Sequence, residues 1–238
     1  MTVRTVLVTG SSSGIGRATT LHLLEQGCTV IGIGRDHARN PLTHSAYHPY
    51  TIDLGQPTRV TGELKKIWSD HPGIDGIISN AGHGRFGQLE NYSPQQITDF
   101  FNVNLLAHVL VARSVVPRLK AKGAGDLILM GSESALQGAQ RGSLYCTAKF
   151  ALRGLAQSLR AECSARGVRV TIINPGMVRT PFFDELKFSP GPEADHAIEA
   201  QDVAEAIWFA LSARRGTVID EMNLTPQKRV IDFGGGPG

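Results

Sequence analysis

Short apolar runs rich in valine and isoleucine recur along this chain, separated by longer segments with a helical pattern. The runs are apolar throughout and do not alternate with polar residues, which is typical of parallel strands covered by helices on both faces. We therefore predict an α/β fold with a doubly wound, seven-stranded parallel sheet in a single domain. The predicted strands are Thr5–Val8, Thr29–Ile33, Tyr50–Ile52, Gly76–Ser79, Leu127–Met130, Arg169–Ile173 and Thr217–Ile219.

Start and stop signals place helices between these strands. A predicted helix over 15–26 ends at Gly27. One domain is expected over 1–238, with a substrate loop at about 181–201 and a disordered tail at 234–238. Further predicted helices begin at Pro94, span 144–165, and run from the capping residue Asp202 to Leu211.

The composition excludes several classes of protein. Of the 238 residues, 41% are hydrophobic and 19% are charged, and the net charge of +3 is too small to favour a nucleic-acid-binding protein. No apolar run approaches ~18 residues, so no transmembrane helix is expected. The first strand begins too near the N-terminus for a signal peptide. Three cysteines without a CxxC pair favour reduced thiols in the cytoplasm and no metal site.

A glycine-rich stretch, Thr9-Gly-Ser-Ser-Ser-Gly-Ile-Gly16, lies between the first predicted strand and the first predicted helix. Gly10, Gly14 and Gly16 permit a tight turn and a close approach of the backbone to a pyrophosphate, and the helix N-terminus points amide groups at the phosphates. The spacing is G-x-x-x-G-x-G and differs from the general G-x-G-x-x-G fingerprint. The stretch therefore predicts a dinucleotide-binding domain of the Rossmann type.

Tyr145 and Lys149 are four residues apart in a predicted helix, which places both side chains on one face. An ammonium group beside a phenol is expected to lower the pKa of the phenol. A phenol with a lowered pKa can give a proton to a carbonyl oxygen or take one from an alcohol. By itself the pair also fits an exposed lysine beside a packed tyrosine.

Several motifs occur in a fixed order along the chain: TGSSSGIG at 9–16, Asp53 after the third strand, NAG at 80–82, Asn104, Ser132, YxxxK at 145–149 and PGMVRT at 175–180. In this order and at these separations they resemble the short-chain dehydrogenase/reductase family over nearly the whole chain. The resemblance implies a Rossmann-type fold and an NAD(P)-dependent oxidoreductase acting on alcohol or carbonyl groups.

The resemblance implies four catalytic residues: Asn104, Ser132, Tyr145 and Lys149. Tyr145 would be the general acid in carbonyl reduction and the base in alcohol oxidation, with Lys149 lowering its pKa and holding the nicotinamide ribose. Ser132, with Ser134 as its rival, would polarise the substrate carbonyl. Asn104 would bend its helix and order a water that contacts Lys149. Two local interpretations stay open: Ser132 as a cap of its own turn, and Asn104 as a buried amide bonded to a helix carbonyl.

The resemblance also implies a set of cofactor contacts. Asn80-Ala-Gly82 would let the adenine ribose pack on the sheet, and Pro175 and Gly176 would turn the chain over the nicotinamide. Asp53 would bind the adenine amino group, although an Asx-turn explains Asp53 equally well. The full implied set is Gly10, Ser12, Ser13, Gly14, Ile15, Gly16, Arg35, Asp53, Leu54, Asn80, Ala81, Gly82, Tyr145, Lys149, Pro175, Gly176, Val178 and Thr180.

The choice of cofactor depends on the end of the second strand. An acid that binds the ribose 2′-hydroxyl favours NAD, and an arginine accommodates the 2′-phosphate of NADP. Gly34 takes the place of the acid and Arg35 follows it, which predicts NADP(H). A rival interpretation makes Asp36 the ribose ligand. Ser13, where relatives that use NADP often carry a basic residue, does not support the NADP prediction.

The substrate pocket is expected from loops after the strand ends. Three phenylalanines in the last loop predict either an apolar lid over the nicotinamide or ordinary packing. Arg85 or Arg141 could bind a substrate carboxylate or be solvated surface arginines, and the segment from Glu221 resembles family members that act on small hydroxy acids or a broad range of carbonyl compounds. The candidate pocket residues are His83, Phe86, Gln137, Arg141, Met177, Phe182, Phe183 and Phe188.

The predicted function is an NADP(H)-dependent oxidoreductase that transfers hydride between the nicotinamide and a carbonyl or secondary alcohol. The alternatives are a catalytically silent NADP(H)-binding sensor or scaffold, and chemistry on a nucleotide sugar. The resemblance implies a homodimer or homotetramer built on helices near 94–121 and 144–166, with no nucleic-acid or membrane partner. The small residues Ala148, Ala151, Gly154 and Ala156 could serve that contact or pack against the chain's own sheet.

Overall fold

The computed structural model describes residues 4–233. Its main sheet has seven strands in the order β3-β2-β1-β4-β5-β6-β10, and every neighbouring pair is parallel. The predicted doubly wound parallel sheet is therefore confirmed. The strands are β1 (Thr5–Thr9), β2 (Thr29–Gly34), β3 (Tyr47–Thr51), β4 (Gly76–Ser79), β5 (Gly125–Met130), β6 (Val168–Pro175) and β10 (Glu221–Leu224).

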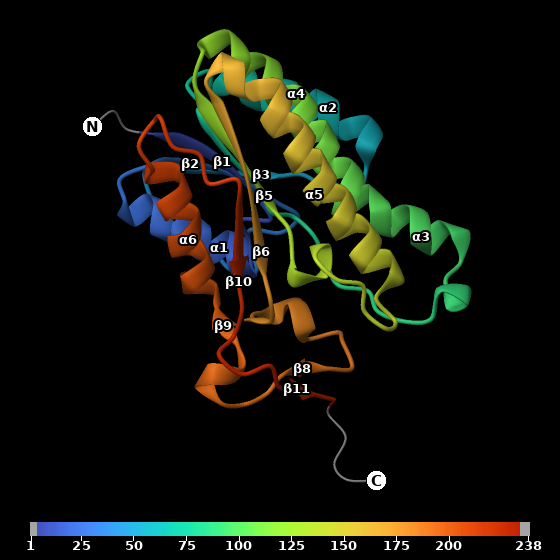
Figure 1. Ribbon diagram of the computed structural model, residues 1–238. Helices are drawn as coiled ribbons and strands as arrows, with labels where there is room; N and C mark the ends of the chain where they lie inside the picture. Colours follow the sequence, from blue (N-terminus) through green and yellow to red (C-terminus); the bar gives the residue numbers. More distant parts are fainter. Residues whose placement is uncertain (1–3, 234–238) are drawn as a thin grey trace.

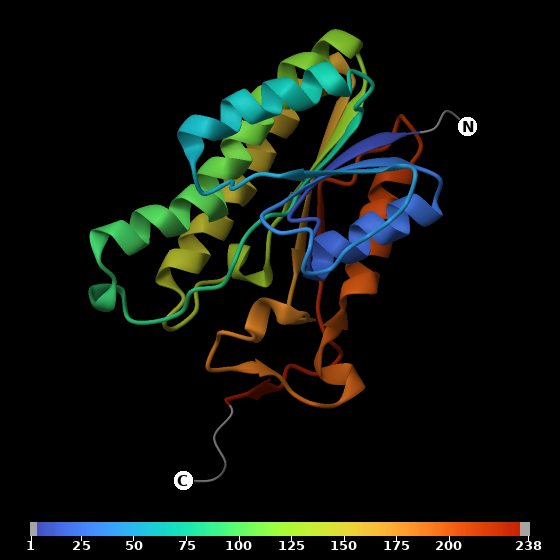
Figure 2. The same cartoon turned by 180° about the vertical axis from the view of Figure 1, so that it is seen from behind.

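Helices cover both faces of this sheet (Figures 1 and 2). One face carries α1 (Gly14–Glu25) and α6 (Ala200–Ser212). The other face carries α2 (Pro57–Asp70), α4 (Ala107–Lys122) and α5 (Ser143–Cys163). The helix α3 (Pro94–Phe101) continues through a π-helical turn, Asn102–Leu106, into α4. Three layers result, with helices above and below a central sheet.

The central strands β1, β2 and β4 are largely apolar because each one contributes side chains to two cores. In β1, Leu7 points into the cluster under α2, α4 and α5, whereas Val6 and Val8 point into the cluster under α1 and α6. In β4, Ile77 and Ile78 divide in the same way. Successive side chains of a strand point to opposite faces, so a sheet covered on both sides needs apolar residues at every position.

The helical run Pro94–Lys122 has an 18-residue window with a mean hydropathy of 1.4, long and apolar enough to cross a membrane by composition alone. It begins with a capping box in which Ser93 and Gln96 bind each other's backbone amides. Val111, Val115 and Leu119 on its inner side belong to the core under α2 and α5. In this fold the run is a packed helix of the domain, and its apolar face contacts the sheet.

Three predicted elements differ from the structure. The third strand begins at Tyr47, three residues before the predicted Tyr50. The last strand is β10 and not the predicted 217–219, because pairing with β6 from Ile172 onward sets its position. Asp202 is not the cap of α6 but its third residue, where it accepts the amide hydrogen of the true N-cap, Glu199. The tail predicted to be disordered, 234–238, lies outside the described residues.

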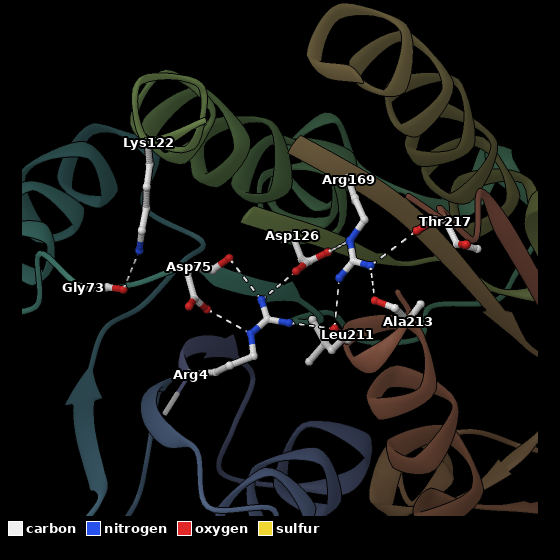
Figure 3. A network of polar contacts seen from close by, with 9 residues as sticks. All are labelled: Arg4, Gly73, Asp75, Lys122, Asp126, Arg169, Leu211, Ala213 and Thr217. Atoms are coloured by element: carbon white, nitrogen blue, oxygen red, sulfur yellow. Dashed lines mark hydrogen bonds and ion pairs between the residues drawn. The ribbon is translucent and has the colours of Figure 1, made fainter. Parts of the chain in front are cut away.

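A buried ion network ties the amino ends of the strands together (Figure 3). Asp126 in β5 pairs with Arg169 at 2.5 Å and with Arg4 at 2.6 Å. Both arginines also donate to the carbonyl oxygen of Leu211, at the end of α6. Arginine at a helix C-terminus binds orphan carbonyls and complements the helix dipole. This network stabilises the end of the sheet opposite the candidate site.

Residues between β6 and α6 form the predicted substrate loop, which lies beyond the carboxyl ends of the strands (Figure 1). Two short strand pairs shape it. β7 (Val178–Arg179) is parallel to β9 (Ile198–Glu199), and β8 (Ser189–Pro190) is antiparallel to β11 (Ile231–Asp232). The predicted loop over 181–201 overlaps α6, which begins at Ala200.

Candidate active site

The candidate site lies at the carboxyl ends of β1, β4, β5 and β6, where the loops after these strands meet. In open parallel sheets ligands bind at this edge, near the point where the strand order reverses. Here β1 lies between β4 and β2, so the reversal falls beside the loop that follows β1. The sequence motifs all end on this edge.

The glycine-rich turn after β1 has the geometry that its residues predict. Gly10 and Gly14 have φ values of +71° and +50°, which favour glycine. A Cβ on Gly16 would overlap the carbonyl oxygen of Gly10. A Cβ on Gly10 would lie 2.9 Å from Nδ2 of Asn80. The first turn of α1 therefore approaches β1 and β4 closely and presents its free amide groups at the edge of the sheet.

The NAG segment after β4 is tied to the end of β1. The Oγ1 of Thr9 accepts the amide hydrogens of Asn80 at 2.9 Å and of Ala81 at 3.0 Å. Nδ2 of Asn80 donates to the carbonyl oxygen of Thr9 at 3.0 Å. Asn80 thus serves the strand-to-loop turn, and Asn80 and Ala81 pack against Gly10 of the glycine-rich turn. The structural role of the NAG motif is therefore to join the end of β4 to the end of β1.

Asn104 lies in the π-helical turn between α3 and α4 and is fully buried. Its Nδ2 donates to the carbonyl oxygen of Phe100 at 3.1 Å, and its Oδ1 accepts the amide hydrogen of His83 at 3.0 Å. The predicted local bend of the helix is present. Single π turns inside α-helices often mark functional sites. Both polar groups of this amide are satisfied within the chain, as the local interpretation of Asn104 proposed.

Tyr145 projects from the first turn of α5, and Ser132 follows β5. Each is 8% exposed, and the Ser132 hydroxyl lies near enough to Tyr145 to lower the pKa of its phenol. The Ser132 oxygen also accepts the amide hydrogen of Ser134 at 3.2 Å, so Ser132 caps its turn as well. Of the two rival serines, Ser132 is therefore the one that affects the pKa of the tyrosine.

Lys149 is one turn further along α5 and only 4% exposed. Its Nζ donates to the carbonyl oxygen of Met130 at 2.9 Å and lies 5.6 Å from the centroid of the Tyr145 ring. Burial lowers the pKa of this amine to about 8. Asn104, Ser132, Tyr145 and Lys149 thus reach the same end of the sheet from the π-helical turn, the β5 loop and α5.

One electrostatic expectation is wrong for this structure. Burial raises the pKa of the Tyr145 hydroxyl to about 12, and the nearby Ser132 hydroxyl only partly opposes this rise. Glu133 and Cys146 raise the pKa further. The predicted lowering by Lys149 does not prevail, because the ammonium is directed to Met130 and the cost of burying a phenolate is larger.

The segment after β6 closes the site from the opposite side. Pro175 ends β6, and the amide of Gly176 donates to the carbonyl oxygen of Leu224 in β10. Val178 is buried in β7, and the hydroxyl of Thr180 donates to its carbonyl oxygen at 3.2 Å. A Cβ on Gly14 would lie 3.4 Å from the side chain of Thr180. The PGMVRT segment thus faces the glycine-rich turn.

Arg35 and Asp36, which follow β2, have different roles in the structure. Arg35 is exposed directly after the strand. Asp36 accepts the amide hydrogens of Ala38 at 2.9 Å and of Arg39 at 3.2 Å, so its carboxylate caps its own turn. His37 lies beneath this turn, with ring nitrogens that contact Tyr50 O and Tyr47 Oη, each at 3.2 Å. Arg35 is therefore free of the turn, whereas Asp36 belongs to it.

Two implied adenine contacts have clear structural roles. Asp53 accepts the amide hydrogen of Gly55 at 2.9 Å and the side-chain amide of Gln56 at 3.0 Å, as expected of an Asx-turn. The side chain of Leu54 is 5% exposed and belongs to the core beneath α2. Leu54 can therefore face a ligand only through its backbone.

An aromatic cluster covers Tyr145. The rings of Phe86 and Phe182 lie 5.1 Å and 5.9 Å from the Tyr145 ring, centroid to centroid. Phe188 lies 5.0 Å from Phe86, and Phe183 lies 5.8 Å from Phe188. Three of these rings come from the substrate loop and one from the loop after β4. Other candidates lie outside the cluster: Gln137 and Arg141 are exposed.

His108 is a residue of this region that the sequence analysis missed. It lies on α4 and is 1% exposed, with Nε2 2.8 Å from the carbonyl oxygen of Ala81 and Nδ1 2.8 Å from Oγ of Ser79. Burial and the charge of Lys149 lower the pKa of His108 to about 3. The sequence gives one indication of its role: His108 is a polar residue on an apolar helix face, four positions after Asn104.

Comparison with known families identifies the architecture. The family model described as short chain dehydrogenase matches residues 4–189, well over half of the chain. The chain belongs to the short-chain dehydrogenase family. As a member of this family it is an NAD(P)-dependent oxidoreductase, and the predicted family resemblance is confirmed.

Relatives of this short-chain dehydrogenase extend over almost its whole length. An uncharacterized oxidoreductase of Staphylococcus epidermidis is 28% identical over 227 residues, covering 94% of this chain and 97% of the relative. Among solved structures, an alcohol dehydrogenase from the archaeon Thermococcus sibiricus complexed with 5-hydroxy-NADP has a TM-score of 0.85 at 24% identity. That match covers 96% of this chain and 99% of the other. Serine dehydrogenase from Escherichia coli has a TM-score of 0.80 at 24% identity, covering 92% and 96%.

Proposed function

We propose that this short-chain dehydrogenase is an NADP(H)-dependent enzyme that interconverts a carbonyl compound and a secondary alcohol, with Tyr145 as the general acid and base. The observation that carries the proposal is that Tyr145 and Ser132 are both buried at the carboxyl edge of the sheet, where the Ser132 hydroxyl acts on the pKa of Tyr145. Two hydroxyl groups side by side can both bind one carbonyl oxygen. Ser132 polarises that oxygen, and Tyr145 delivers the proton.

The pKa of Tyr145 sets the direction in which the proton moves most readily. At about 12 the hydroxyl is protonated throughout the neutral range. It is therefore ready to protonate the oxygen formed in reduction. For oxidation it must first lose its own proton, and Lys149 is the nearby cation that stabilises the phenolate. Asn104 is proposed to order a water that passes the proton on to solvent.

The residues around the edge of the sheet fit a dinucleotide. The glycine-rich turn packs closely against Asn80 and Thr180, and the first turn of α1 supplies amide groups for a pyrophosphate. When bound, the nicotinamide supplies or accepts the hydride at the carbonyl carbon. We assign Val178 and Thr180 to the carboxamide and Lys149 to the nicotinamide ribose.

The end of β2 favours NADP(H) over NAD(H). Arg35 is exposed and can bind a 2′-phosphate through charge-assisted bonds. Asp36, the rival ligand for a 2′-hydroxyl, already caps the turn to Arg39. The alcohol dehydrogenase of Thermococcus sibiricus was crystallised with 5-hydroxy-NADP, and another short-chain oxidoreductase of the same fold with NADP. These neighbours support the same cofactor here.

The aromatic cluster favours a neutral, apolar substrate. Phe86 and Phe182 contact the Tyr145 ring, so a carbonyl group at Tyr145 would carry its substituents among aromatic rings. Two nearby arginines are engaged elsewhere: Arg179 pairs with Glu199 at 3.2 Å, and Arg85 lies 6.0 Å from the Tyr92 ring centroid. We therefore assign apolar carbonyl compounds to this site in preference to small hydroxy acids.

Two further parts of the proposal concern the cellular compartment and the oligomeric state. All three cysteines, Cys28, Cys146 and Cys163, are buried free thiols, in keeping with the cytoplasm. A homo-oligomer is proposed through the outer faces of α4 and α5. Of the small residues considered, Ala148 and Ala156 pack in the chain's own core, whereas Gly154 is exposed.

A turnover assay separates this enzyme from a silent NADP(H)-binding sensor. The purified chain is mixed with NADPH and a panel of apolar ketones and aldehydes, and the decay of NADPH absorbance is followed. We expect turnover of several panel members and none in the Tyr145→Phe variant. Tight NADPH binding without turnover of any member would instead favour the sensor.

A further inference from the structure

His108 and Ser79 form a buried polar pair directly behind the candidate site. Both residues are 1% exposed. The ring of His108 makes two short contacts: Nδ1 with Oγ of Ser79, and Nε2 with the carbonyl oxygen of Ala81, each at 2.8 Å. Buried polar groups must be hydrogen-bonded, and these contacts satisfy all of the polar atoms of the ring.

The partners fix the tautomer of His108. A carbonyl oxygen can only accept, so Nε2 carries a hydrogen and donates it to Ala81. In a neutral imidazole Nδ1 is then an acceptor, and the Ser79 hydroxyl donates to it. Burial and the adjacent ammonium of Lys149 keep the pKa of His108 near 3. The ring is therefore a neutral donor with one fixed orientation.

Hydrogen bonds hold the two peptide groups on either side of Ala81. The amide hydrogen of Ala81, in the peptide group that joins it to Asn80, is donated to Oγ1 of Thr9 at 3.0 Å. Its carbonyl oxygen, in the peptide group that joins it to Gly82, accepts from His108 at 2.8 Å. Thr9 ends β1, and His108 belongs to α4. One of these successive peptide groups is thus bonded to the central strand of the sheet, and the next to a helix on one face.

A second contact lies one helical turn away. Oδ1 of Asn104 accepts the amide hydrogen of His83 at 3.0 Å. Asn104 and His108 are four residues apart across the junction of the π-helical turn and α4, and both bond to the segment that follows β4. Two tethers on one helical face fix the rotation and the height of the helix relative to that segment.

We propose that His108 is a positioning residue: its Nε2–H holds the carbonyl group between Ala81 and Gly82 and thereby sets the place of Asn104 and of the cofactor-facing loop 80–82. The proposal rests on the proposed function for its effect on turnover. The hydrogen bonds that His108 makes to Ser79 and Ala81 do not depend on the proposed function. An apolar residue at 108 could fill the same volume, but it would leave the Ala81 carbonyl and the Ser79 hydroxyl buried without a partner.

Variants at 108 and 79 separate positioning from packing. His108→Leu removes the donor, His108→Gln keeps an N–H that can reach Ala81, and His108→Asn has a shorter amide that cannot. Ser79→Ala removes only the outer partner of the ring. The exposed His44→Leu serves as a control for loss of a histidine. The Kd for NADPH is measured by fluorescence, alongside kcat and Tm.

We expect His108→Leu and His108→Asn to lower kcat by about 10- to 100-fold, since a shift of about 1 Å in a catalytic group has an effect of this size. The Kd for NADPH should rise several-fold. His108→Gln should recover most of both losses. If His108→Leu does not fold, the comparison of His108→Gln with His108→Asn decides. Equal values of kcat and of the NADPH Kd in these two variants would overturn the proposal.

A double-mutant cycle with Asn104→Ala shows whether His108 acts through Asn104. Coupled residues give non-additive effects. The kcat loss from His108→Leu, or from His108→Asn where the leucine variant does not fold, should therefore be much smaller when residue 104 is already alanine. Fully additive losses would mean a role confined to general stability, and the positioning claim would fall.

Nuclear magnetic resonance of the wild-type chain tests the claim without turnover. Long-range ¹H–¹⁵N spectra should show a His108 ring protonated at Nε2 and unprotonated at Nδ1 from pH 5 to pH 9. A charged ring or the opposite tautomer would refute the inference. Should the wild type bind NADPH and turn over no carbonyl compound, the proposed function fails, whereas the tautomer and the NADPH Kd values still decide the role of His108.

Discussion

Nζ of Lys149 donates its hydrogen bond to the carbonyl oxygen of Met130 at 2.9 Å and not to the hydroxyl of Tyr145. The end of β5 therefore holds the ammonium, and the tyrosine keeps its proton. Burial raises the pKa of Tyr145 to about 12 and lowers that of Lys149 to about 8. The two residues that the YxxxK motif brings together are thus both shifted toward their neutral forms.

Removal of the Tyr145 hydroxyl should abolish chemistry and spare binding. In Tyr145→Phe we expect turnover to fall by about 10²- to 10⁴-fold, the usual contribution of a positioned acid. The NADPH Kd, measured by fluorescence titration, should stay within about twofold, because no direct cofactor bond of the phenol is essential. Tyr92→Phe is a matched control, since the Tyr92 hydroxyl is buried without a partner. Near-native turnover in Tyr145→Phe would contradict the assignment.

The two reaction directions should differ in pH dependence. Below its pKa Tyr145 is the protonated acid, so kcat/KM for carbonyl reduction should be constant from pH 6 to pH 8. Oxidation needs the deprotonated phenol beside a charged Lys149, so its kcat/KM should rise by about tenfold per pH unit up to about pH 8, where Lys149 loses its proton, and then level off. Steady-state assays in overlapping buffers measure both. A plateau of oxidation near pH 7 would show that the pKa of the base is much lower.

Arg35 should control the preference between cofactors. In Arg35→Ser the charge-assisted bond to a 2′-phosphate is lost, and we expect kcat/KM for NADPH to fall by about 10- to 100-fold. The value for NADH should change little. Arg59→Ser, an exposed arginine on α2, is the control. Equal losses with both cofactors would indicate a role other than binding the 2′-phosphate.

The aromatic cluster should discriminate by charge. Benzoylformate and its methyl ester differ mainly in one negative charge, and we expect the ester to have the higher kcat/KM with NADPH. Phe188→Ala should reduce this preference, because Phe188 packs on Phe86 beside Tyr145. Phe150→Ala, exposed on α5, should not. A preference for the free acid would favour a carboxylate-binding arginine instead.

The ion network in Figure 3 should stabilise the fold without contributing to chemistry. Asp126→Asn leaves Arg4 and Arg169 without their shared carboxylate, and loss of one partner of a buried ion pair costs about 3–5 kcal/mol. Urea unfolding measures the change, with Glu162→Gln as an exposed control. At a temperature where the variant is folded, kcat should be unchanged. A change in kcat without loss of stability would contradict this division.

The apolar strands could be predicted because the residue pattern of each strand depends on whether its two faces are buried. Val6 and Leu7 feed different cores, so an uninterrupted apolar run marks a strand covered on both faces. The last strand could not be placed in the same way. β10 lies at the edge of the sheet, and its Glu221 is held by Arg153 at 3.0 Å, so pairing with a distant strand sets its position.

In the candidate site, too, some features follow from local sequence and others from contacts between distant segments. The glycine turn and the YxxxK pair depend on local spacing, and the amino-acid sequence determined both, together with the family. Only the tertiary structure decided the charge states. The raised pKa of Tyr145, the direction of Lys149 and the tautomer of His108 follow from groups brought together from separate strands and helices. Electrostatic energies depend on distance in space and on burial, and neither quantity is written in the order of residues along the chain.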